Sequence, residues 1–93
     1  MTTQLRLSKS GFQFVFANGV TASVQFSDTH YCDMLPASRG AAASSAEVAA
    51  FVAGGKWRTQ EIYPDIGDDV AGHQTPDEVV YFLVKCAALP ALT

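Results

Sequence analysis

The sequence predicts an α+β fold, in which an antiparallel β-sheet of four or five strands in meander order carries one C-terminal α-helix packed on one face. Two observations lead to this fold class. Phe12–Phe26 contains two alternating apolar runs separated by Asn18-Gly19, the strongest local pattern for a β-hairpin. Thr75–Glu78 opens an apolar segment of helical period that runs to a proline. The chain has 93 residues, 48% of them hydrophobic and 16% charged, so we expect a single globular domain spanning residues 1–93.

The segment Thr3–Lys9 alternates weakly, which predicts a short first strand with Leu5 and Leu7 on one face. Arg6 and Lys9 suit an edge strand, because charged side chains discourage pairing with other chains. We therefore expect this strand at one edge of the sheet.

The register of the Phe12–Phe26 hairpin follows from its apolar stripes. A two-residue turn at Asn18-Gly19 would place the aromatic stripe of the first strand and the apolar stripe of the second on opposite faces. A three-residue loop, Ala17–Gly19 with Gly19 left-handed, brings the two stripes to one face, pairing Phe16 with Val20, Phe14 with Ala22 and Phe12 with Val24. Because a slip of one residue moves a whole stripe, we predict the three-residue loop. The other face is then polar and consists of Gln13, Thr21, Ser23 and Gln25.

The next two stretches are less clear in the sequence. Residues 27–45 show no period, and long loops of this kind are usually functional or contain an unrecognised element. A short helix around Gly40–Ser45 is one alternative, because the stretch is rich in alanine. Ala46–Val52 and Trp57–Tyr63 then predict a second hairpin, with Ala53–Lys56 at its tip.

The second hairpin has two alternative registers. A three-residue loop places Phe51 opposite Trp57, which is a favourable aromatic pair, whereas a longer loop places Val52 opposite Trp57. A helix over Ser45–Ala53 competes with the first strand of this hairpin, since its composition permits one. We prefer the strand.

The C-terminal helix has the clearest boundaries in the chain. Thr75 is predicted to be its N-cap, with Pro76 at the first helical position and the Glu78 side chain reaching back, as in a capping box. The helix is expected to end near Leu89, because Pro90 cannot continue it.

The predicted helix is apolar on nearly all sides. Its main stripe consists of Val79, Phe82, Leu83, Cys86 and Leu89, and the opposite side of Val80, Tyr81, Val84 and Ala88. A helix of this kind is covered on more than one side. We expect the second cover to be the 27–45 segment, a second copy of the chain or another protein.

The charge is distributed unevenly along the chain. The net charge is −3, but residues 1–58 have a balance of +2 and residues 59–93 a balance of −5. This distribution argues against direct nucleic-acid binding through a broad basic surface. It fits a protein partner with a basic surface.

Most of these acids lie in or beside a predicted glycine-containing loop, Pro64–Gln74. The candidate partner-binding residues are Glu61, Tyr63, Asp65, Asp68 and Asp69. Spaced carboxylates can imitate phosphates, so the loop could dock on a groove that normally holds nucleic acid. One alternative is a metal site, although these carboxylates lack the alternating spacing of the oxygen ligands in calcium loops. The other alternative is a solvated loop that keeps the protein soluble.

Other side chains suggest chemistry only weakly. Two histidines and two cysteines could form a zinc site, but their spacing is unusual; the four residues are His30, Cys32, His73 and Cys86. A cysteine–histidine nucleophile pair, oriented by Asp28 or Asp33, is a second alternative. Because no catalytic or phosphate-binding motif occurs, we expect no enzyme, no cofactor and no metal. The start of the chain lacks a signal peptide, and no stretch is long and apolar enough to span a membrane, so we expect a cytoplasmic protein with two free thiols.

Several pieces of the chain resemble small proteins encoded by phages and prophages. These pieces are Phe16–Phe26, Tyr31-Cys32, Ala46–Phe51 followed by Gly54–Trp57, Asp68–Gly72 and Thr75–Val79. The resemblance spans most of the chain and implies no site residues. Small acidic phage proteins of this size are often inhibitors of host defence, anti-CRISPR proteins among them.

The sequence therefore suggests a non-enzymatic phage or prophage inhibitor in the cytoplasm of a bacterial host cell. We expect it to bind a defence complex, such as a CRISPR effector, and to block a basic nucleic-acid-binding surface with its acidic patch. The alternative is a phage structural or assembly protein that acts as a homodimer through the C-terminal helix.

Overall fold

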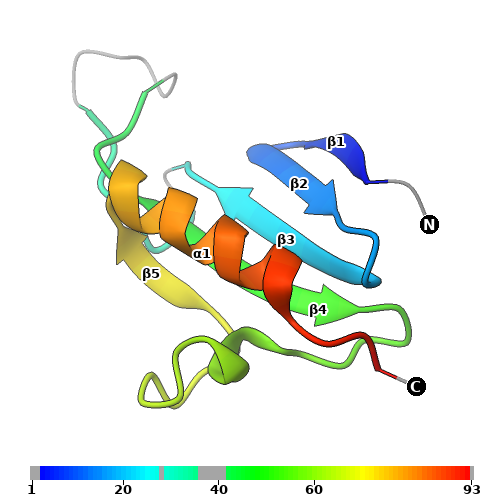
Figure 1. Cartoon of the computed structure of the whole chain (residues 1–93). Coiled ribbons are helices and arrows are strands. Elements are labelled where there is room, and N and C mark those ends of the chain that lie inside the picture. The colour runs from blue at the N-terminus through cyan, green and yellow to red at the C-terminus, as the bar shows by residue number, and fades with distance from the viewer. Residues whose placement is uncertain (1–2, 28, 36–41, 93) are drawn as a thin grey trace.

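The computed structural model describes residues 3–27, 29–35 and 42–92. Its elements in chain order are β1 (Gln4–Ser8), β2 (Gly11–Val15), β3 (Val20–Gln25), β4 (Ala46–Val52), a 3₁₀ turn (Thr59–Glu61), β5 (Ala71–Gln74) and α1 (Pro76–Ala88). The five strands form one antiparallel sheet in the order β1-β2-β3-β4-β5, and α1 crosses one of its faces (Figure 1). The predicted α+β fold is confirmed.

The β2–β3 hairpin has the predicted register. Phe12 lies opposite Val24 and Phe14 opposite Ala22, so the aromatic and apolar stripes share one face. The loop has three residues: the Phe16 N–H donates to the Val20 carbonyl at 2.9 Å. Gly19 has a φ of 85°, the left-handed conformation that glycine adopts without strain.

The second hairpin was predicted only in part. Ala46–Val52 is a strand, so the alternative of a helix over Ser45–Ala53 is wrong. Phe51 lies opposite Trp57, as the three-residue loop requires. The predicted strand over Trp57–Tyr63 is wrong, because backbone pairing ends with the hydrogen bond from the Arg58 N–H to the Ala50 carbonyl at 2.7 Å, and the chain then enters the 3₁₀ turn.

The Thr59 side chain explains why this pairing ends. Its Oγ1 accepts a hydrogen bond from the Ala50 N–H at 2.9 Å and donates to the Asp69 carbonyl at 2.6 Å. A hydroxyl thus occupies the place of a backbone group of a neighbouring strand. The edge of β4 that would have paired with residues 59–63 is completed further along by β5, where Gln74 lies opposite Ala46 and Ala71 opposite Val48.

β5 corrects the prediction that Pro64–Gln74 is entirely loop, because Ala71–Gln74 is the fifth strand. This strand is irregular. A register shift separates its two pairs with β4, and His73 has a φ of 52°, which is uncommon for a residue with a side chain.

The segment 27–45 also contains pairing that the sequence did not indicate. Met34 bridges Ala43, and the Ser44 N–H donates to the Asp33 carbonyl at 2.8 Å. The alternative of a helix around Gly40–Ser45 is wrong for residues 42–45, which are not helical; residues 40 and 41 lie outside the described residues.

The capping box of α1 is present as predicted. The Glu78 N–H donates to the Thr75 hydroxyl, the Thr75 N–H donates to the Glu78 carboxylate, and Pro76 is the first helical residue. The helix ends at Ala88, with Leu89 as its C-cap.

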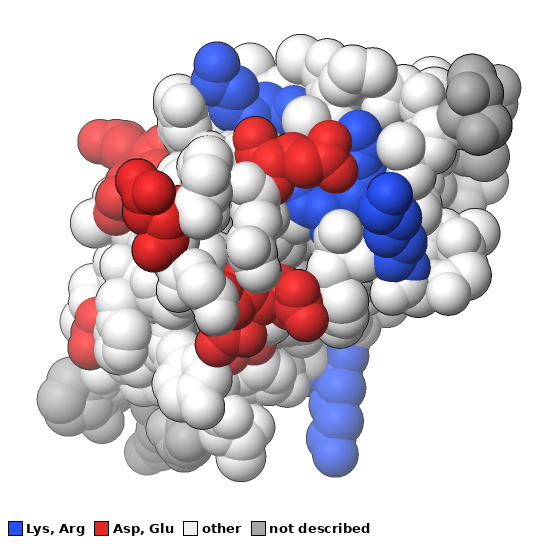
Figure 2. All heavy atoms as spheres, turned by 90° about the horizontal axis from the view of Figure 1, so that it is seen from below, with Lys and Arg blue, Asp and Glu red and all other residues white. Residues whose placement is uncertain are grey.

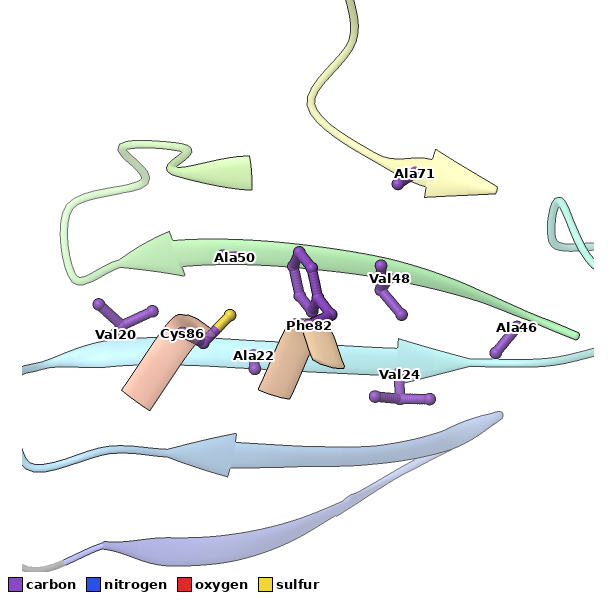
Figure 3. Packing of buried hydrophobic residues seen from close by; sticks show 9 residues of the cluster. All are labelled: Val20, Ala22, Val24, Ala46, Val48, Ala50, Ala71, Phe82 and Cys86. Carbon is purple, nitrogen blue, oxygen red and sulfur yellow. The ribbon is translucent and has the colours of Figure 1, made fainter. Parts of the chain in front are cut away.

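The core lies between α1 and the two central strands. Phe82 and Cys86 project from α1 onto β3 and β4 and are fully buried (Figure 3). Beneath them the sheet presents mostly small side chains, so the helix can approach it closely; the buried sheet residues of this cluster are Val20, Ala22, Val24, Ala46, Val48, Ala50 and Ala71. The predicted stripe of α1 is confirmed as its buried side, since Val79, Leu83 and Leu89 also pack against this cluster.

The carboxyl end of α1 is held by the loop of the β2–β3 hairpin. The Asn18 side-chain amide donates to the carbonyls of Cys86 at 2.9 Å and Leu89 at 2.8 Å, while its Oδ1 accepts from the Val20 N–H at 3.0 Å. The Cys86 carbonyl also accepts a hydrogen bond from the Leu89 N–H at 3.3 Å. Asn18 thus adds to the cap of α1 from a distant part of the chain.

Candidate functional site: the acidic loop

The acidic loop, residues 61–69, is held at both ends. At its start, Nε and Nη2 of Arg58 donate to the two carboxylate oxygens of Glu61 at 2.6 and 2.8 Å. At its end, the Asp69 carbonyl accepts the hydrogen bond from Thr59. Both anchoring side chains come from the short segment that precedes the loop.

The carboxylate of Glu61 is bound by Arg58. Arg58 is only 2% exposed, and its Nη1 also donates to the Pro90 carbonyl at 2.7 Å, which ties the loop to the chain beyond α1. The hydrogen bonds from Arg58 hold the pKa of Glu61 below its usual value, despite partial burial. A carboxylate bound in this bidentate way offers less charge to a partner than a free one.

Tyr63 belongs to the packing beneath the loop. Its ring is stacked on Phe82 and on Tyr81, with ring centroids 5.7 and 6.3 Å apart. Burial raises the pKa of its hydroxyl. On the helix surface the ring of Tyr81 is in turn covered by Lys85, whose Nζ lies 5.4 Å from its centroid.

The other three acids face solvent. Asp65, Asp68 and Asp69 are exposed, and within the described residues none of them forms an ion pair. Asp68 Oδ1 accepts a hydrogen bond from the Asp69 N–H at 2.7 Å. Gly67, which precedes Asp68 in the loop, has a φ of 65°. The loop is thus a closed turn whose outer surface displays three carboxylates.

Figure 2 shows the underside of the molecule, the side on which the segment joining β4 to β5 lies in Figure 1. Acidic side chains gather towards the left and centre of this face, and basic side chains lie beside them at the top and towards the right. Lys56 is close enough to Glu61 to contribute to its lowered pKa. A partner would therefore meet a charged boundary on this face rather than a uniformly acidic surface.

The structure separates the five sequence-predicted site residues into two groups. Asp65, Asp68 and Asp69 are available to a partner, whereas Glu61 and Tyr63 position the loop. The residues that sequence reasoning missed are Arg58 and Thr59. The three-residue spacing from Arg58 to Glu61, which suits a helical ion pair, was the one available indication.

A second polar cluster joins the 29–35 segment to β5. Asp33 Oδ2 accepts a hydrogen bond from the Ser45 hydroxyl at 2.8 Å and lies 3.1 Å from Nδ1 of His73. These two contacts hold the pKa of Asp33 below its usual value, the contact with His73 having the larger effect. The cluster fixes the irregular backbone of β5 to the segment beside it.

The residues of the suggested cysteine–histidine pair lie in different surroundings. His73 does meet Asp33, but the Cys32 thiol donates to the Ser27 carbonyl at 3.3 Å, and Nδ1 of His30 lies 2.6 Å from the Ser27 hydroxyl. Asp28, the other suggested orienting residue, lies outside the described residues.

Cys86 is separate from these groups. It is a free, buried thiol, and burial raises its pKa to about 12, so it stays protonated at neutral pH. Within the part of the chain that the structure describes, no three His, Cys, Asp or Glu side chains are arranged to hold a metal ion.

Comparisons with protein-family models, with curated proteins and with solved structures found no significant match. Among the described residues, no helix combines the length and the apolar character needed to cross a bilayer.

Proposed function

We propose that the protein is a non-enzymatic inhibitor that docks its acidic loop on a basic, nucleic-acid-binding surface of a bacterial defence complex. The observation that supports this most is the outer surface of the loop, where Asp65, Asp68 and Asp69 are exposed and form no ion pair with any described residue. Carboxylates spaced along a fixed backbone can take the positions of successive phosphates in a basic groove. The defence context and the location in the bacterial cytoplasm are parts of this proposal that rest on the resemblance to phage and prophage proteins.

The anchors of the loop favour a binding role. Because Thr59 and the Arg58–Glu61 pair fix both ends, less conformational entropy is lost when a partner orders the carboxylates. The neighbouring basic side chains limit how the loop can be oriented on a partner, since like charges placed opposite each other are repelled.

The test uses bacteria with an active CRISPR system and a plasmid that this system targets. Expression of the protein should raise the transformation efficiency of the targeted plasmid on the order of 100-fold or more, because a loss of about 3 kcal/mol in binding of the target already means a factor of about 100. The Asp65→Asn/Asp68→Asn variant should lose this effect. The wild-type protein should displace DNA from the purified effector, and this double variant should not.

The matched control raises the net charge by the same amount away from the loop. Gln4→Lys/Asp77→Asn changes exposed residues on β1 and at the start of α1, and it should inhibit as the wild type does. Equal loss of inhibition in both double variants would mean that inhibition depends on the net charge alone and not on the acidic loop. Unimpaired interference with the wild-type protein, together with no binding to the effector, would overturn the proposal.

A further inference from the structure

The helix covers only part of the sheet. α1 packs mainly on β3, β4 and β5, and β1 and β2 extend beyond it (Figure 1). On the helix side of this uncovered half lie Leu5 and Leu7, which pair with Phe14 and Phe12. Leu5 is 72% and Leu7 95% exposed, so no described residue covers either side chain.

The outer side of the helix, on the same face of the sheet, is also apolar and exposed. Val80 and Val84 are 61% and 62% exposed, and their spacing of four places them one above the other. Tyr81, a neighbour on the helix surface, stacks on Tyr63 from the segment that joins β4 to β5. Because successive helical residues are rotated by about 100°, Val80 and Val84 lie roughly opposite the buried Phe82 and Cys86 and point away from the sheet.

Together these residues form one apolar surface, of which the uncovered half of the sheet is the lower part and the outer side of α1 the raised part. Asp77 borders this surface, one helical turn before Val80 on the same side of α1, whereas two other charged neighbours point elsewhere. Arg6 alternates with Leu5 and Leu7 and projects from the other face of β1, and Lys85 lies over the Tyr81 ring on the far flank of the helix.

We propose that this surface binds a second copy of the chain, in a two-fold dimer with its axis parallel to the strands. A rotation of 180° about such an axis places α1 of each copy over the β1–β2 half of the other copy's sheet. The two helices then lie side by side between two sheets. A single symmetric contact thus buries the uncovered half of the sheet and the helix of both copies, which is the self-complementarity that a two-fold interface requires.

The area agrees with a dimer of moderate strength. A helix of 13 residues is about 20 Å long, and two strands are about 10 Å wide. Each copy therefore contributes two strips of about 20 by 10 Å, or roughly 800 Å² of flat area for the whole dimer. Side-chain relief brings the accessible area towards the lower end of stable interfaces, about 1,200 Å².

The experiment measures the mass of the full chain by sedimentation equilibrium between roughly 1 μM and 1 mM, a range that brackets a moderate affinity. The wild type should change from monomer to dimer within this range. Leu7→Glu and Val84→Glu should each raise the dissociation constant at least tenfold, because each places two carboxylates in the apolar interface of the dimer. Both side chains are exposed, so the fold should survive, which circular dichroism can check.

Gln4→Glu is the matched control. Gln4 lies on the same strand as Leu7 but projects from the other face, so the same added charge should leave the dimer intact. The Asp65→Asn/Asp68→Asn variant should also remain dimeric, which separates this proposal from the function of the acidic loop.

Three results would overturn the proposal. The first is a monomer at every concentration, whatever other molecule binds the surface. The second is a dimer that neither substitution weakens. The third is a dimer that Leu7→Glu disrupts but Val84→Glu does not, which would mean edge-to-edge pairing of β1 without the helix.

Discussion

Asn18 connects two parts of the chain that are 68 residues apart in sequence. Its Oδ1 accepts a hydrogen bond within the hairpin loop, and its NH2 group donates to two carbonyls at the carboxyl end of α1. A residue that favours turns thus also caps the end of α1. The two roles use different atoms, so they can be separated by substitution.

Asn18→Ala should lower the free energy of unfolding by about 1–2 kcal/mol, because the loop loses its acceptor and the helix its cap. Asn18→Asp keeps the acceptor for the Val20 N–H but places a negative charge against the negative end of the helix dipole. We therefore expect Asp to destabilise at least as much as Ala in urea denaturation. An Asp variant as stable as the wild type would contradict the capping role of the amide.

The ion pair of Glu61 predicts how stability depends on pH. Because the folded-state pKa of Glu61 is lowered, its stabilising contribution is present above the unfolded-state pKa of 4.5 and is lost as pH falls through the lower folded-state value. Glu61→Gln should cost about 1–3 kcal/mol at pH 7, because Arg58 stays buried without a carboxylate. Urea denaturation at pH 7 and pH 3 should show this difference shrinking at the lower pH. A difference that is the same at both values would exclude the pair as its cause.

At the scale of elements, the segment between β4 and α1 shows what the sequence could and could not predict. The β2–β3 hairpin and α1 were predictable because their determinants are local: a turn pair, an alternating stripe and a capping box. β5 was not, since Ala71–Gln74 has few residues that favour strands and pairs with a strand that lies more than 20 residues earlier in the chain. The strand predicted over Trp57–Tyr63 failed because a hydroxyl, and not a backbone group, meets the Ala50 N–H.

Thr59→Val tests whether the Thr59 hydroxyl replaces a neighbouring strand as the hydrogen-bonding partner of β4. Valine has nearly the same shape, but it leaves the Ala50 N–H and the Asp69 carbonyl without their partner, which should cost about 1–3 kcal/mol. The unfolding midpoint and the mobility of residues 61–69 by NMR would measure the effect. Thr59→Ser keeps the hydroxyl and serves as the control; if it destabilised as much as Val, the methyl group and not the hydrogen bonds would be responsible.

At the scale of the whole molecule, the charge asymmetry of the sequence located the acidic loop. It could not distinguish the residues that are available to a partner from those that hold the loop in place. Five similar candidates were visible, and only the structure shows that Glu61 meets Arg58 and Tyr63 meets Phe82. Such contacts depend on the path of the chain between β4 and β5, which no local pattern reveals. The apolar outer side of α1 was visible in the sequence, whereas the β1–β2 half of the sheet that the helix leaves uncovered was not.

The proposed dimer predicts that stability depends on protein concentration. Because only the folded state associates, the thermal unfolding midpoint should rise as the concentration increases from about 5 to 500 μM, across the range of a moderate dissociation constant. Leu7→Glu should remove this dependence, and Gln4→Glu should retain it, in calorimetry at matched concentrations. A midpoint independent of concentration in the wild type would contradict the dimer.

The order of the elements along the chain also affects how the protein folds during its synthesis. The four strands that precede residue 53 can pair as they leave the ribosome, but the helix that covers β3 and β4 emerges after them. Until then, the apolar face of the sheet has no cover within the described residues, and the Asn18 amide has no helix to cap. A nascent chain that stalls before residue 76 should therefore depend on chaperones, whereas one that has released α1 can complete the core.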